Sequence, residues 1–188
     1  MKTKSTTQWL VEDDQEVYSA PPWITVHRQR LLLPNGRTVG DYHQIALRDY
    51  VIVVAQTTEG KYIAERQYKH GIGKVSLLLP GGVIEAGEEP LSAARRELLE
   101  ETGYQADNWR ALGVYVSDAN YGCGNAHFFV ASDARKVTDP DSGDLEDMQI
   151  VLMDAAGLIE AVRTGEILAI GAVAAVAWAL NPAMTAVR

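Results

Sequence analysis

The sequence feature that most constrains the fold is a charged segment bounded by glycines, from Gly82 to Gly103. Pro90 suits the first turn of a helix, and the two glutamates before it lie at the positive end of the helix dipole. Gly103 is a good C-terminal stop, because glycine readily adopts the left-handed conformation in which many helices end. Apolar residues recur at helical spacing between these points: Leu91, Ala94 and Leu98. The segment therefore predicts a helix that begins at Pro90 and ends at Gly103.

Three carboxylates share one face of this helix, because Glu97, Glu100 and Glu101 are three or four residues apart. Like charges at this spacing repel each other, which destabilises an isolated helix. A cluster of carboxylate oxygens is a suitable ligand set for hard divalent cations such as Mg²⁺. The alternative is a solvated helix face rich in glutamate and arginine, which is common in proteins.

The turn before the helix, Leu79-Pro80-Gly81-Gly82, adds to the metal hypothesis. Its glycines allow a ligand to approach the backbone closely, and the Gly81 carbonyl is a candidate metal ligand. The guanidinium of Arg96 has a fork that suits the positioning of carboxylates. Together these groups suit a metal-clamped diphosphate, in which the metals neutralise charge and activate a water.

The rest of the chain predicts a mixed α/β fold with helices packed on a largely antiparallel or mixed sheet. Turn residues separate β-rich runs in the first third and in the middle, and helical patterns close the chain. The expected strands are Trp23–Leu33, Tyr42–Leu47, Val51–Gln56, Tyr62–Tyr68, Ala111–Val116, Ala126–Ala131 and Met148–Met153. The expected final helices are Ala155–Arg163 and, after a break at Gly165, a second one that ends at Leu180.

Composition excludes several classes of protein. The 188 residues include 25 acidic and 17 basic side chains, a formal net charge of -8, which argues against a general nucleic-acid binder. The most apolar stretch, Ile167–Leu180, is shorter than the roughly 20 residues of a membrane helix. The single cysteine, Cys123, cannot form an internal disulfide, and Met1–Gln8 lacks the apolar core of a signal peptide. We therefore expect a cytoplasmic protein that does not contact a membrane.

The segment from Gly82 to Tyr104 resembles the Nudix box, the signature of a family of metal-dependent hydrolases. Its defining residues are Gly82, Glu88, Arg96, Glu97, Glu100, Glu101 and Gly103. Tyr104 is the one departure, since an aliphatic residue is more usual there. The resemblance implies that Glu97 and Glu101 are the principal metal ligands. It also implies that Glu100 is a further ligand or the base, that Arg96 orients the carboxylates, and that Glu88 acts structurally through Arg96.

Beyond the box, the chain is similar to the ADP-ribose pyrophosphatase branch of the family from Trp23 to Leu180, including Arg66-Gln67-Tyr68-Lys69. This similarity implies a Nudix-type mixed-sheet sandwich between helices in residues 49–188. It further implies an N-terminal tail and small antiparallel β subdomain in residues 1–48, which commonly takes part in a homodimer. Arg66 and Lys69 are then candidate substrate-binding residues.

The same comparison points to an acidic stretch after the sheet, where relatives often place a metal-binding or water-activating glutamate. Glu146 is the candidate for that role and Asp144 the second choice; an ordinary solvated acidic loop is the alternative. Three departures concern the substrate. Leu78 stands where relatives often have a glutamate, and Lys69 replaces an arginine and loses its bidentate geometry. In the loop after the box, ADP-ribose hydrolases often have a proline where this chain has Asp118-Ala119-Asn120-Tyr121. Tyr121 is a candidate substrate-binding residue, as in dinucleoside polyphosphate hydrolases.

The resemblance thus implies hydrolysis of a nucleoside diphosphate compound, with ADP-ribose or another nucleotide sugar as the leading substrate. Mg²⁺ or Mn²⁺ would bridge Glu97, Glu100 and Glu101 to the phosphates, and Glu146 or Glu100 would help to deprotonate the attacking water. The products would be a nucleoside monophosphate and a sugar phosphate. The alternatives are hydrolysis of dinucleoside polyphosphates or oxidised nucleotides, and a Nudix-fold nucleotide sensor without turnover.

Overall fold

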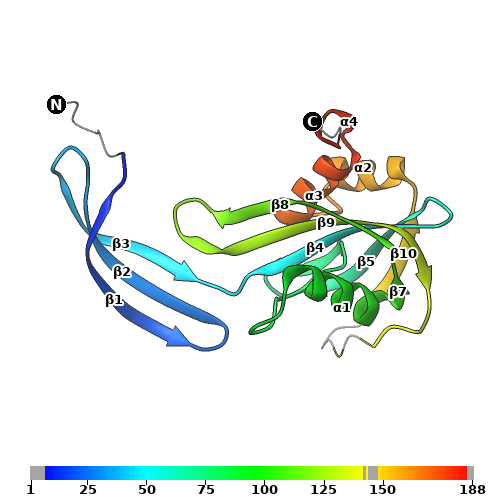
Figure 1. The fold of residues 1–188 in the computed structure, drawn as a ribbon, viewed down its shortest axis with the longest axis horizontal. Coiled ribbons are helices and arrows are strands. Elements are labelled where there is room, and N and C mark those ends of the chain that lie inside the picture. Colours follow the sequence, from blue (N-terminus) through cyan, green and yellow to red (C-terminus); the bar gives the residue numbers. More distant parts are fainter. Residues whose placement is uncertain (1–6, 142, 144–147, 186–188) are drawn as a thin grey trace. The chain divides into compact units, whose positions relative to one another are not determined.

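The computed structural model describes residues 7–141, 143 and 148–185. The candidate base Glu146 and its second choice Asp144 lie outside the described residues. Helices and strands follow the order shown in Figure 1: β1 (Leu10–Ala20), β2 (Ile24–Leu32), β3 (Thr38–Ala46), β4 (Tyr50–Thr57), β5 (Tyr62–Lys69), β6 (Lys74–Leu78), α1 (Pro90–Thr102), β7 (Tyr104–Gln105), β8 (Asn108–Asp118), β9 (Gly122–Lys136), β10 (Met148–Met153), α2 (Ala155–Thr164), α3 (Ile170–Leu180) and α4 (Pro182–Thr185).

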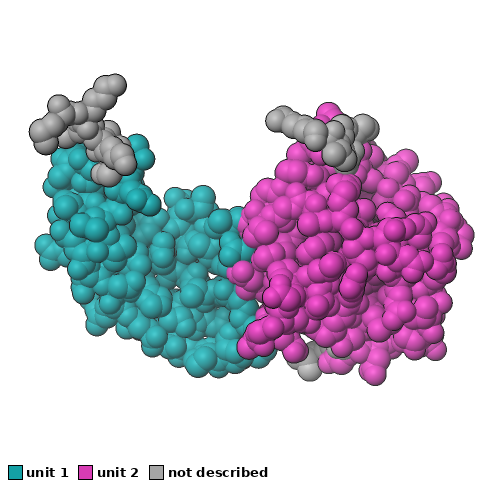
Figure 2. All heavy atoms as spheres, in the orientation of Figure 1, with its two compact units in different colours: residues 1–48, 116–125 teal, residues 49–115, 126–188 magenta. Residues whose placement is uncertain are grey.

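The chain divides into two compact units, coloured separately in Figure 2. The first contains Met1–Arg48 and Val116–Asn125, and the second contains Asp49–Tyr115 and Ala126–Arg188. Strands β8 and β9 therefore run from one unit into the other along the chain.

The first unit is built on an antiparallel sheet in which β1 pairs with β2 and β2 pairs with β3. The expected hairpin of β2 and β3 is confirmed, and the turn between them includes the expected Pro34-Asn35-Gly36. The strand β1 was not expected, because its sequence is polar and acidic and carries no alternating apolar face. Its partner β2 supplies the pairing, with Leu10 opposite Leu32 and Ala20 opposite Ile24.

The second unit is organised around β4, a β-branched run that is almost wholly buried. One edge of β4 pairs in parallel with β9, from Tyr50 opposite Ala126 to Thr57 opposite Ala134. Beyond the β4–β5 turn, β5 pairs antiparallel with β6 on one side and with β10 on the other. A strand buried on both faces reads as a continuous apolar run, which is the pattern of β4.

Helices cover both faces of this sheet (Figure 1). On one face, α1 buries Ala94 and Leu98 against a cluster that includes Val51, Val53 and Ile63. On the other face, α2 and α3 bury side chains such as Leu158 and Val176 against Ile52, Val54 and Leu77. The alternation of β4 side chains between the two clusters follows from the two-residue period of a strand. The expected fold class, a mixed sheet between helices with a small antiparallel β subdomain, is confirmed.

The helix boundaries agree with the sequence signals. Helix α1 begins at Pro90, and its C-cap Gly103 is left-handed, with φ 75° and its N–H bonded to the Leu99 carbonyl. Helix α2 is capped by the Asp154 side chain, which accepts from the Gly157 N–H at 2.8 Å, and ends at left-handed Gly165. No helix among the described residues is long and apolar enough to cross a membrane.

Candidate active site

The turn that precedes α1 is hydrogen-bonded to β4 through its backbone. The Val53 N–H donates to the Pro80 carbonyl and the Val51 N–H donates to the Gly82 carbonyl, each at 2.8 Å. Gly81 lies between these two residues with φ 154°. A Cβ added there would collide with the Val51 carbonyl, so both the backbone conformation and the available space require glycine.

The same turn lies directly against the carboxylates of α1. The Gly81 N–H donates to Oε2 of Glu101 at 2.7 Å. A Cβ added at Gly82 would collide with the carboxylate of Glu97. Two consecutive glycines therefore bring the backbone into contact with two of the three predicted metal ligands.

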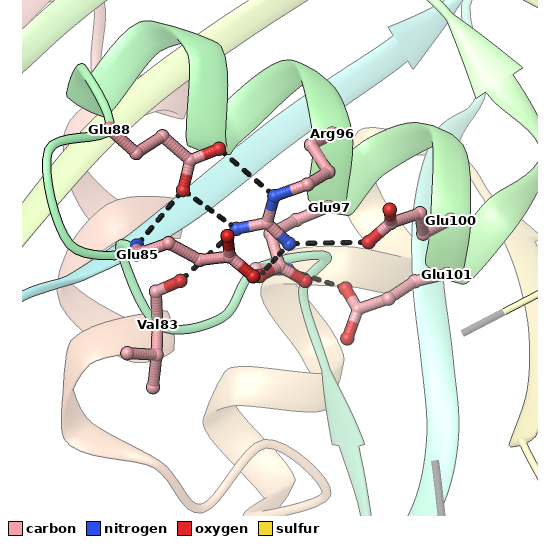
Figure 3. A network of polar contacts seen from close by, with 8 residues as sticks. Val83, Glu85, Glu88, Arg96, Glu97, Glu100 and Glu101 are labelled. Carbon is pink, nitrogen blue, oxygen red and sulfur yellow. Dashed lines mark hydrogen bonds and ion pairs between the residues drawn. The ribbon is translucent and has the colours of Figure 1, made fainter. Parts of the chain in front are cut away.

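Arg96 joins the carboxylates of Glu88, Glu97 and Glu100 into one network, shown in Figure 3. Its Nε and Nη2 donate to the two oxygens of Glu88, both at 2.9 Å, which is a bidentate ion pair. Its Nη1 donates to Glu97 at 2.8 Å and to Glu100 at 3.2 Å. Nη2 also reaches the Val83 carbonyl at 3.2 Å. The contact between Arg96 and Glu88 that the box resemblance implies is present.

The carboxylates differ in their exposure to solvent. Glu101 is 7% exposed, whereas 45% of the Glu100 side chain is accessible. Burial raises the pKa of Glu97, and the neighbouring guanidinium of Arg96 opposes that rise. The bond to Glu88 is the largest cause that raises the pKa of Arg96, so this side chain stays charged. The cluster thus contains a buried, an intermediate and an accessible carboxylate beside one fixed cation.

The chemistry of these groups fits a hard divalent cation, because their donors are carboxylate oxygens next to a backbone carbonyl. In the conformation described, Arg96 bonds Glu97 and Glu100 and the Gly81 N–H bonds Glu101. Within residues 7–141, 143 and 148–185, no group of three or more His, Cys, Asp or Glu side chains is arranged to hold an ion. Rearrangement of the Arg96 contacts would accompany metal binding at these residues.

Of the three candidate substrate-binding residues, Arg66 and Lys69 lie in the second unit and Tyr121 lies in the first. Arg66 extends from the face of β5 that carries Ala64, and it pairs with Glu166 at 3.3 Å. Lys69 lies at the end of β5, at a register position on the opposite face from Arg66. Tyr121 belongs to the first unit, where it lines a cavity of about 310 Å³ together with Asp14 and other residues.

Sequence reasoning missed one charged residue of the second unit, Glu65. It is 1% exposed and lies on the same face of β5 as Ile63, which packs in the α1 cluster. The available signal was the alternation of the Tyr62–Tyr68 segment, in which Glu65 and Gln67 occupy inward positions. A charged residue at an inward position of a strand is unusual and indicates a special environment.

A model of the Nudix domain matches residues 46–168, which include the whole α1 site. The chain belongs to the Nudix hydrolase family. The match runs from the end of β3 to the segment between α2 and α3, so the expected family is confirmed by the domain as a whole and not by the box alone.

Two relatives within the Nudix family extend over most of the chain. The chain is 30% identical to the ADP-ribose pyrophosphatase of Bacillus subtilis (strain 168) over 141 residues, covering 73% of this chain and 76% of the relative. It is 32% identical to the ADP-ribose pyrophosphatase of Mycobacterium tuberculosis over 165 residues, covering 84% and 79%. A crystal structure of an ADP compounds hydrolase superposes with a TM-score of 0.80 at 23% identity, covering 93% of each chain, and this likeness concerns the Nudix fold.

Proposed function

We propose that this Nudix hydrolase cleaves the diphosphate linkage of ADP-ribose or another nucleotide sugar, giving a nucleoside monophosphate and a sugar phosphate. The observation that carries the proposal is the contact of Gly81 and Gly82 with the carboxylates of Glu101 and Glu97. The relatives named ADP-ribose pyrophosphatase support the substrate class, because each matches more than two thirds of the chain.

In the proposed reaction, Glu97, Glu100 and Glu101 would hold Mg²⁺ or Mn²⁺, with the Gly81 carbonyl as a further ligand. A divalent cation held there would neutralise charge on the diphosphate and make a water molecule more acidic. Glu101 is the most firmly placed ligand, since it is buried and bonded to the Gly81 N–H at 2.7 Å. The carbonyls on either side of Gly81, those of Pro80 and Gly82, accept hydrogen bonds from β4.

The accessible Glu100 is suited to accept a proton from the attacking water, because nearly half of its side chain is open to solvent. Glu146 shares this proposed role, although it lies outside the described residues. Arg96 holds Glu97 and Glu100 near each other from the side of Glu88 before an ion binds, and these contacts would rearrange when the two carboxylates ligate the ion. Lys69 is favoured over Arg66 as a phosphate contact, since Arg66 is paired with Glu166 on the other face of β5.

The test is a panel of substrates with Mg²⁺ or Mn²⁺, with products separated by chromatography. The panel contains ADP-ribose, other nucleotide sugars, dinucleoside polyphosphates, NADH, and normal and oxidised nucleotides. We expect AMP and ribose 5-phosphate from ADP-ribose as the preferred reaction, and loss of activity with a chelator. Preference for another substrate class would refute the nucleotide-sugar assignment. Tight nucleotide binding without any product would favour the sensor alternative.

A matched pair of variants tests the ligand assignment. Glu101→Gln keeps the shape of the side chain but removes its charge, and it should lower kcat at least about a hundredfold without unfolding the protein. Glu160→Gln makes the same change at an exposed position of α2, where Glu160 pairs with nearby Arg163 at 2.6 Å, and it should leave kcat unchanged. Near-normal activity of Glu101→Gln would show that this carboxylate is not a metal ligand.

We also propose that the protein acts as a homodimer through its first unit. Strand β1 and the residues that flank it expose large apolar side chains that water would otherwise contact: Trp9, Leu10, Val11, Val17, Tyr18 and Trp23. Sedimentation of the wild-type protein should give twice the monomer mass. The double variant Tyr18→Glu/Trp23→Glu should sediment as a monomer, while Glu16→Gln on the same strand should not change the mass. A monomeric wild-type protein would contradict the proposal.

A further inference from the structure

A carboxylate lies inside the second unit at a position that the proposed reaction does not use. Glu65 in β5 is 1% exposed, as is Gln67 two residues later. Both share a face of β5 with Ile63, which packs against the α1 cluster, because side chains alternate along a strand. Across the sheet, Glu65 lies opposite Ile150, which also packs against that cluster. The Glu65 carboxylate therefore belongs to the face of the sheet on which α1 and its glutamates lie.

The strand register places Glu65 opposite the residue from which the chain enters the glycine turn of the site. Glu65 is directly opposite Leu78 in the antiparallel pair of β5 and β6. Directly opposite residues of such a pair project on the same face, with Cβ atoms about 5 Å apart. Leu78 comes two residues before Pro80, and the chain then passes through the two glycines that contact Glu101 and Glu97. The residue opposite Glu65 is thus the last residue of β6, from which the chain leads into the turn that lines the site.

We propose that Glu65 bears a negative charge and thereby raises the affinity of the α1 site for a divalent cation, as a carboxylate outside the set of direct ligands. The inference rests on the proposed function, because it assumes that Glu97, Glu100 and Glu101 bind a metal. A charge inside a protein is screened less than one in water and acts over a longer distance. Glu65 lies opposite Leu78 and outside the turn itself, so it acts on the ion as an outer carboxylate and not as a direct ligand.

The first experiment measures Mn²⁺ binding by calorimetry in the absence of substrate. Glu65→Gln preserves the shape of the side chain and removes its charge, and it should raise the Kd for Mn²⁺ about tenfold, the effect typical of outer groups of a metal site. The matched control is Glu59→Gln in the exposed β4–β5 turn, which should leave the Kd unchanged. An unchanged Kd in Glu65→Gln overturns the inference.

A second experiment moves the carboxylate across the strand pair. Glu65→Leu should weaken Mn²⁺ binding, and Glu65→Leu/Leu78→Glu should recover it to within about threefold of the wild type, because the charge stays beside the same turn. A folded double variant, with the melting temperature of the wild type but the weak binding of Glu65→Leu, overturns the inference. If Glu65→Leu does not fold, Glu65→Gln decides the question alone.

Glu101→Gln is titrated alongside these variants to separate the two proposals. Loss of Mn²⁺ binding in Glu101→Gln with no effect of Glu65→Gln overturns the role of Glu65 and leaves the proposed metal site intact. Mn²⁺ binding in Glu101→Gln that is as tight as in the wild type overturns the metal site itself, and the inference on Glu65 falls with it. A weaker affinity in both variants, with Glu59→Gln unchanged, supports both.

Discussion

Removal of the Arg96 side chain should destabilise the protein much more than removal of an arginine from an ordinary surface ion pair. Arg96→Ala leaves Glu88 and Glu97 partly buried without the guanidinium that they both contact at 2.8–2.9 Å. Breaking a buried ion pair from one side costs about 3–5 kcal/mol. Since 25% of the Arg96 side chain is exposed, we take the lower end, about 3 kcal/mol. For a chain of this length that corresponds to a fall in Tm of about 6–12 °C.

Thermal unfolding followed by circular dichroism, in the presence of a chelator, measures this effect. The control is Arg163→Ala, which breaks a pair with Glu160 of similar length but with both side chains exposed. Exposed pairs contribute at most about 1 kcal/mol, so the control should lower Tm by no more than about 4 °C. Equal shifts in Arg96→Ala and Arg163→Ala would refute the reasoning, because they would mean that the carboxylates of α1 do not depend on Arg96.

Two further substitutions distinguish the effect of the site on turnover from the effect of the core on stability. Gly82→Ala should lower kcat about tenfold or more with little loss of Tm, because its Cβ displaces the Glu97 carboxylate; normal turnover would contradict the contact. Leu98→Ala, at a fully buried position of α1, should reduce the free energy of unfolding by about 2–5 kcal/mol in urea titrations. A loss below about 1 kcal/mol there would show that α1 is not packed on β4 as described.

Local signals explain why much of the fold was predictable. Pro90 and Gly103 set the ends of α1 through their own backbone preferences, and Gly165 does the same between α2 and α3. The strand β1 was missed because its side chains are nearly all exposed, so no alternation marks it. Its existence depends on pairing with β2, which is a tertiary effect that a local pattern does not contain.

The site shows the same division between local and nonlocal information. Helical spacing alone places Glu97, Glu100 and Glu101 on one face of α1. The sequence shows that Leu78 replaces a glutamate common in relatives. It does not show that Glu65 lies opposite Leu78 in the sheet. The two residues are opposite each other only through the register of β5 and β6, and that register is fixed by the buried face of the sheet.

The pairing of the glycine turn with β4 has a consequence for how ligand binding can be observed. The amide protons of Val51 and Val53 are held by the carbonyls of Gly82 and Pro80, in the middle of the most buried strand. For these protons to exchange with solvent, the turn must leave β4, and the same opening would withdraw Gly81 from Glu101. The exchange rates of the Val51 and Val53 amide protons therefore report how often the site opens, and any ligand that binds the turn should lower these rates.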